Sequence, residues 1–164
     1  MINAPFYDPY IARVKDSDIL TTLEDQMNST YELLNNIGED KGNYAYEPGK
    51  WTIKEITGHL IDSERVFGYR ALRFSRKDNT ELAGYEQDDY VANSDYNSRP
   101  LAELAEELLN LRKANLSMFR SFTDNMLQMT GVANGSEVSV DALLYIIAGH
   151  EKHHINVIKE KYLN

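Results

Sequence analysis

The sequence contains no cysteine among its 164 residues. Disulfide bonds, thiolate metal ligands and a thiol nucleophile are therefore excluded, and redox chemistry gives no indication of the compartment. Any reaction of a thiol on this protein requires a thiol supplied from outside the chain.

Long apolar runs are also missing. No stretch approaches the roughly 20 consecutive apolar residues that a helix needs to cross a bilayer, and the first ten residues lack the basic and apolar segments of a secretory signal. We therefore expect a cytoplasmic protein with no membrane partner.

Positive charge is scarce, because 17 lysines and arginines stand against 26 aspartates and glutamates, which gives a net charge of −9. Such a surface repels a phosphate backbone and argues against nucleic-acid binding. One local basic patch is present at Arg65, Arg70, Arg73, Arg76 and Lys77. The hydrophobic content of 42% is typical of a globular protein, and the length predicts a single domain over residues 1–164.

Apolar residues recur at steps of three and four in four segments, which predicts four amphipathic helices. These helices cover approximately residues 18–37, 52–74, 98–124 and 139–161. Their start signals are, in order, Ser17 or Asp18, a capping box of Thr52 with Glu55, Ser98 with Pro100, and Ser139. Gly38 is expected to end the first helix. Because no strand pattern is convincing, we predict an all-α four-helix bundle.

The connections are predicted as an extended arm over residues 1–16, a loop over 39–50, a long connection over 75–97 and a loop over 125–138 with a turn at Asn134-Gly135. The 75–97 connection carries apolar residues, so it packs either as a lid beside the site or as a crossover that covers the end of the bundle. Helix order stays open, because both middle connections can cross the bundle.

Three of the four histidines lie in the segment Gly149-His150-Glu151-Lys152-His153-His154. His150 and His154 are four residues apart and fall within the apolar stripe of the last predicted helix. Two adjacent buried imidazoles each have a donor and an acceptor to satisfy, and a shared metal ion removes that cost. His153 lies at the edge of the stripe and is a reserve ligand.

The fourth histidine, His59, lies at the border of the second helix's apolar stripe, from which it can reach the bundle axis. Together with His150 and His154 it would leave at least one position of a zinc-like ion open, as catalytic sites do. Asp62, Glu64 and Glu151 are candidates to orient an imidazole or move a proton. For Glu64 a structural ion pair with Arg70 or Arg73 is the alternative.

His150 to His154 also match H-E-x-x-H, the signature of zinc proteases in which the glutamate is the general base. Those enzymes generally take their third ligand from further along the chain. Only ten residues follow His154, and none is a histidine. The strand pattern expected beside a peptidase cleft is absent as well, so the protease interpretation is rejected.

Several segments resemble the DinB-like proteins. Gly49-Lys50-Trp51-Thr52-Ile53-Lys54-Glu55 and Gly58-His59-Leu60-Ile61-Asp62-Ser63-Glu64-Arg65 look like that family's second helix. Arg70 to Arg76 and Gly84 to Asp88 are similar to its middle segment, and Gly149 to Ile155 to its last helix. The resemblance covers about Asp18 to Leu163.

This resemblance implies a four-helix bundle with a divalent metal held by His59, His150 and His154. Zinc or nickel is the first expectation, and iron or manganese the second. Some members of the family transfer bacillithiol or isomerise with mycothiol, others are described as metal-dependent hydrolases, and members often form homodimers. The resemblance therefore also implies an external low-molecular-weight thiol and a second copy of the chain as partners.

The leading hypothesis is a metal-dependent enzyme that activates a small thiol and transfers it to a small-molecule electrophile. A second hypothesis is hydrolysis by water activated on the metal, with Glu151 or Asp62 carrying the proton. A third is a metal-binding or dimeric interaction module without catalysis. An open coordination position separates the first two hypotheses from the third.

Overall fold

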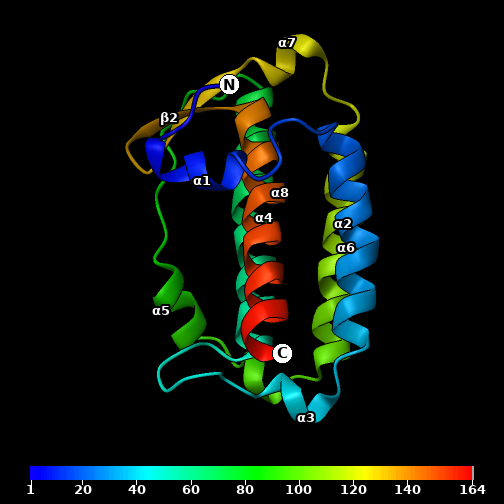
Figure 1. The fold of residues 1–164 in the computed structure, drawn as a ribbon. Coiled ribbons are helices and arrows are strands. Elements are labelled where there is room, and N and C mark those ends of the chain that lie inside the picture. The colour runs from blue at the N-terminus through cyan, green and yellow to red at the C-terminus, as the bar shows by residue number, and fades with distance from the viewer. Residues whose placement is uncertain (164) are drawn as a thin grey trace.

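Four long helices form the body of the protein in the computed structural model, which describes residues 1–163 (Figure 1). They are α2 (Ile19–Asn35), α4 (Ile53–Ser75), α6 (Leu101–Phe119) and α8 (Val140–Val157), and a π-helical turn, η3 (Ile158–Tyr162), continues α8. The predicted all-α four-helix bundle is confirmed. No helix within residues 1–163 is both long and apolar enough to span a membrane.

The connection between α4 and α6 sets the directions of the helices. Near its start, the Leu82 amide donates to the Val132 carbonyl oxygen at 3.0 Å, and near its end the Asn97 side chain donates to Glu55, in the first turn of α4, at 2.9 Å. It therefore runs the length of the bundle, through α5 (Gln87–Ala92) and η2 (Tyr96–Ser98). As a result α4 and α6 are parallel, and α2 and α8 run the opposite way (Figure 1). Only this middle connection crosses the bundle.

Residues 130–139 form a β-hairpin, which corrects the prediction of a loop there. Strands β1 (Thr130–Ala133) and β2 (Ser136–Ser139) pair antiparallel around the predicted turn. Asn134 and Gly135 both have positive φ, 52° and 70°, as a two-residue hairpin turn requires. Each strand has only four residues, too few for a clear alternating pattern. Leu82 bridges to Ala133 and fixes the start of the crossover against the hairpin.

The capping signals are partly confirmed. The Asp18 side chain accepts from the Thr21 amide at 2.8 Å at the start of α2, and the Thr52–Glu55 capping box begins α4. Ser139 does occupy the N-cap position of α8, but its hydroxyl caps nothing; it accepts instead from the Ile2 amide at 2.8 Å. The predicted cap thus holds the N-terminal segment.

Two predicted helix ends are wrong. Helix α2 ends with Asn36 as its C-cap, and Gly38 begins the short helix α3 (Glu39–Gly42) instead. Helix α6 ends at Phe119, and the residues near Asp124 form a separate turn, α7 (Asp124–Leu127), which Thr123 caps. Short polar helices of this kind have too few residues to show a period.

The N-terminal arm is helical rather than extended, with η1 (Pro5–Tyr7) followed by α1 (Asp8–Ile11). Its predicted aromatic packing is present, because Tyr7 packs edge-on against Phe67 at 5.9 Å between ring centroids. Helix α1 lies against α8 at Gly149, where a Cβ atom would be 2.0 Å from the Tyr10 carbonyl oxygen. Glycine therefore permits the contact that brings the arm next to His150.

A polar layer divides the core of the bundle in two. One apolar cluster packs the hairpin and α1 against the adjoining ends of α4 and α8, and a second packs the other end of the bundle around η2 and η3. Between them lie the buried polar side chains of Thr30, His59, Glu64, Arg112, His150 and Glu151. All four long helices contribute to this layer.

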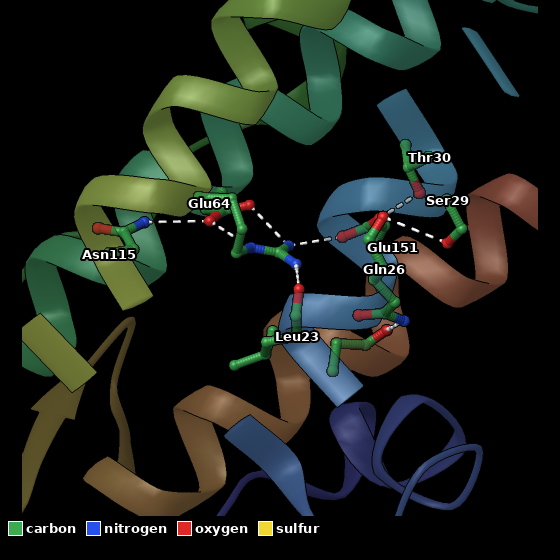
Figure 2. A network of polar contacts seen from close by, with 9 residues as sticks. Leu23, Gln26, Ser29, Thr30, Glu64, Asn115 and Glu151 are labelled. Carbon is green, nitrogen blue, oxygen red and sulfur yellow. Dashed lines mark hydrogen bonds and ion pairs between the residues drawn. The ribbon is translucent and has the colours of Figure 1, made fainter. Parts of the chain in front are cut away.

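Arg112 is the centre of the charged half of this layer, and its side chain is only 2% exposed. Its guanidinium donates to both oxygens of Glu64, at 2.7 and 2.8 Å, to Glu151 at 2.5 Å and to the Leu23 carbonyl oxygen at 3.1 Å. Burial lowers the pKa of Arg112, but the two carboxylates more than offset this and keep it charged. Figure 2 shows that Thr30 and Asn115 complete the network. Glu64 therefore has the predicted arginine partner, but it is Arg112 rather than Arg70 or Arg73.

We predict that Arg112→Met lowers the free energy of unfolding by about 3–5 kcal/mol, because it leaves two buried carboxylates without a counter-charge. Urea denaturation followed by circular dichroism measures the change. The control is Arg120→Met, which removes an ion pair with Glu24 whose side chains are about half exposed and costs less than about 1 kcal/mol. Equal losses in the two variants would contradict a special role for the buried network.

Candidate metal centre

Three imidazoles from two helices meet in the middle of the polar layer. The Nε2 atom of His150 lies 3.0 Å from Nε2 of His59 and 3.2 Å from Nε2 of His154. One possible ligand atom from each ring falls within 4.8 Å of the others. The structure thus brings together the three histidines that the sequence selects, one from α4 and two from α8.

Burial keeps these imidazoles neutral. His59 is 2% exposed and His150 is 8% exposed. Burial lowers the pKa of His59 to about 4, and burial followed by the neighbouring His59 and His153 lowers the pKa of His154 to about 3. The pKa of His150 is also well below its usual value, chiefly because of burial. The neutral form is the one that binds metals.

The donor set fits a divalent ion. Zinc–nitrogen bonds of about 2.0–2.1 Å at a tetrahedral angle place two imidazole nitrogens about 3.3–3.4 Å apart, close to the 3.0 and 3.2 Å found here. Without an ion, three ring nitrogens converge on one point and cannot all pair as donor with acceptor. Within residues 1–163 the cluster includes no carboxylate, so a fourth position stays open.

The hydroxyl of Ser63 holds the ring of His59. If Nε2 of His59 faces a metal, Nδ1 carries the proton and donates to Ser63 Oγ, which lies 3.4 Å away. Ser63 Oγ in turn lies 2.9 Å from the hydroxyl of Tyr85 in the crossover. This role of Ser63 is not predicted from the sequence, although its position four residues after His59 on one helix face is a visible signal.

The three candidate carboxylates lie near the imidazoles but do not hydrogen-bond them. Glu64 and Glu151 bind Arg112, and Asp62 accepts from the Tyr96 hydroxyl at 2.7 Å. These contacts show that the carboxylates join neighbouring elements of the bundle.

A cavity of about 10 Å³, near the size of one water molecule, is lined by His150 and the charged network.

His153 is not one of the three clustered histidines, although its ring lies 5.0 Å from that of His154 between centroids. Its Nδ1 atom lies 3.3 Å from a guanidinium nitrogen of Arg13, and its ring packs against Tyr10 at 5.6 Å. The reserve ligand is thus not needed for a three-histidine centre, because both His150 and His154 face His59.

Two clefts reach the histidine cluster. The first, which we call the His150 cleft, has a volume of about 390 Å³ and is lined by His150 together with residues of the arm, the crossover and the hairpin turn. The second, the His154 cleft, has a volume of about 350 Å³ and is lined by His154, Trp51 and Tyr162, among others. Asp88 of α5 lines both clefts, so the crossover forms part of the walls beside the site.

The sequence profile of the DinB superfamily matches residues 22–158. The chain belongs to the DinB superfamily.

Two relatives are distant from this chain in sequence. A protein of Oceanobacillus iheyensis named "Putative metal-dependent hydrolase" is 25% identical over 143 residues, covering 85% of this chain and 81% of that protein. A protein of the same description from Halalkalibacterium halodurans is 22% identical over 157 residues, covering 91% of this chain and 89% of its own length. These names apply to the relatives.

Two solved structures of proteins from Bacillus subtilis share the fold of this chain. YfiT, described as "a probable metal-dependent hydrolase with an unusual four-helix bundle topology", gives a TM-score of 0.75 at 17% identity, over 98% of this chain and 87% of YfiT. A DinB-like protein, YjoA, gives a TM-score of 0.61 at 20% identity, with 86% of each chain covered. The DinB-superfamily bundle described here thus has the same overall topology.

We predict that the purified protein carries about one divalent ion per chain and that His59→Ala, His150→Ala and His154→Ala each remove it, because each deletes one of three ligands. Elemental analysis measures the metal content and identifies the metal. His153→Ala is the matched control, since it removes an imidazole from the same helix that is not one of the three clustered ligands. Loss of metal in the control, or retention in all three ligand variants, would contradict the assignment.

Replacing Ser63 by alanine should weaken zinc binding about 10- to 100-fold, because the ring of His59 loses the hydroxyl that orients it. Competition with a chelating dye measures this affinity. Ser75→Ala, a buried serine on the same helix that bonds only neighbouring residues, is the control, and an equal effect there would show that the loss is not local.

Proposed function

We propose that this protein is a metal-dependent enzyme that transfers a small external thiol to an electrophilic small molecule. The observation that carries the proposal is a three-imidazole centre, without a fourth protein ligand in residues 1–163, that two clefts approach from different histidines. A transfer reaction needs two substrates to meet, and the two clefts provide a place for each.

His59, His150 and His154 would hold the ion, for which zinc and nickel are the leading candidates because imidazole suits both. When bound, a divalent ion supplies Lewis acidity, which lowers the pKa of a thiol or water that it contacts. The protein's own contribution is orientation: Ser63 fixes the ring of His59, and Tyr10 packs edge-on against His150 at 5.3 Å. Trp51 packs against His59 at 4.9 Å between ring centroids and forms part of the wall of the His154 cleft.

In this transfer reaction no residue of the protein changes its oxidation state. The thiol loses its proton to solvent water, its sulfur forms a bond to an electrophilic carbon, and the leaving group departs with the electron pair of the broken bond. The chain contains no cysteine, so it offers no competing nucleophile of the same kind.

Hydrolysis by activated water is the second candidate, and the names of the relatives favour it. It requires a group that accepts the proton of water. The two carboxylates considered for this role are engaged elsewhere, Glu151 with Arg112 and Thr30, and Asp62 with Tyr96. A thiol, with a pKa of about 8.5 before any metal lowers it, needs such a group less than water does, so this arrangement supports thiol transfer over hydrolysis. The absence of a fourth ligand within residues 1–163 argues against a purely structural metal site.

Homodimerisation and a cytoplasmic location stay predictions from the family resemblance and from the composition.

We predict that the metal-loaded protein accelerates the reaction of a small thiol, such as cysteine or glutathione, with a model electrophile such as monochlorobimane. The reaction is followed by the fluorescence of the product. His154→Ala should reduce the rate to that of the uncatalysed reaction, because it removes a ligand, whereas Arg120→Met, at a residue that lines neither cleft, should keep it. Hydrolysis of a nitrophenyl ester without added thiol, lost on metal removal, would favour the second candidate instead; no turnover in either assay would refute both.

A further inference from the structure

Within residues 1–163, the largely buried side chain of Arg70 has no acidic partner. The residue lies on α4, is 4% exposed and lines the His150 cleft. It makes one hydrogen bond, from Nη2 to the Ala83 carbonyl oxygen at 3.1 Å, and lies over the ring of Phe67 at 5.6 Å. Within residues 1–163 no carboxylate oxygen lies within 4.0 Å of its nitrogens.

The contrast with Arg112 shows what Arg70 lacks. Arg112 is equally buried but bonds two carboxylates. In the described part of the chain, the only fully buried side-chain nitrogen or oxygen without a partner is Oε1 of Gln26. The remaining N–H groups of Arg70 are therefore not completely covered by other protein atoms, and they are accessible from the cleft. A positive charge in a largely enclosed position is stabilised most by an anion placed against it.

We propose that Arg70 binds the carboxylate of a small organic substrate in the His150 cleft. A single guanidinium presents two parallel N–H groups that match the two oxygens of one carboxylate. Glu86 and Asp88 also line this cleft and are exposed at its mouth. Their negative charge disfavours a dianion such as a phosphate ester more strongly than a singly charged carboxylate.

The rest of the cleft suits an apolar or aromatic body. Its volume of about 390 Å³ falls within the range of small-molecule sites, and its walls include the rings of Tyr7, Tyr10 and Phe67. The ring of Phe67 lies close to both His150 and Arg70: its centroid is 6.3 Å from that of the His150 ring and 5.6 Å from the Arg70 guanidinium. A small molecule anchored at Arg70 can therefore extend along Phe67 toward the histidine cluster.

The role of Arg70 in binding a substrate rests on the proposed function. The binding of a carboxylate to Arg70, however, is measured without turnover. The probes are 3-phenylpropionate and its neutral amide, titrated by calorimetry into metal-loaded protein. We expect the wild type to bind the carboxylate about tenfold or more tightly than the amide, as a charge-assisted pair would. Arg70→Gln should reduce the carboxylate affinity to that of the amide and leave the amide affinity unchanged, and Arg70→Lys should restore part of the preference.

The matched control is Arg73→Gln, on the same helix, where the arginine pairs with Asp78 and does not line the cleft; it should keep the full preference. A preference that survives Arg70→Gln would mean that the carboxylate binds the metal and would overturn the proposal. Equal loss of both probes in Arg70→Gln would assign Arg70 to holding Ala83 and Phe67, with the same consequence. Failure of the wild type to bind either probe, or tighter binding of inorganic phosphate than of the carboxylate, would also overturn it.

The two proposals fail separately. An Arg70-dependent preference without turnover in the thiol or ester assays would leave the anion site standing and refute the enzyme assignment. Turnover without a preference for the carboxylate over the amide would support the enzyme assignment and refute the anion site at Arg70.

Discussion

The charged contact between Arg112 and its two carboxylates fixes the geometry on which the site depends. Glu64 belongs to α4 and Glu151 to α8, and one guanidinium from α6 bonds both. This contact sets the positions of α4 and α8 relative to each other along the bundle. His150 directly precedes Glu151, and His59 lies five residues before Glu64. The same register therefore decides whether the imidazoles meet.

Placing such groups in the middle of a bundle has a consequence for chemistry. Burial removes water and holds the imidazoles neutral, which leaves their nitrogens available as ligands. The layer is covered on the side of α1 and the crossover by aromatic rings, among them Tyr10 and Tyr85. The polar layer thus interrupts the apolar core, and the proposed site lies at the point where the layer opens to the two clefts.

The helices and the pairing of His150 with His154 could be predicted because their signals are local. The capping box at Thr52 and the i, i+4 spacing of His150 and His154 depend only on residues near one another in sequence. The hairpin was missed because its strands are four residues long, although the Asn134-Gly135 turn was visible. The arm was expected to be extended because its prolines mask two short helical turns.

The sequence by itself determined the helical class, the amphipathic faces and the pairing of His150 with His154, because a helix places side chains on a face by their spacing alone. Only the tertiary structure decided which arginine neutralises Glu64, since Arg112 is 48 residues away and on another helix. It also decided that the crossover runs the length of the bundle, which brings Tyr85 to Ser63 and exposes Arg70 to a cleft. These contacts join residues that no local spacing relates, so they become defined only when the helices pack.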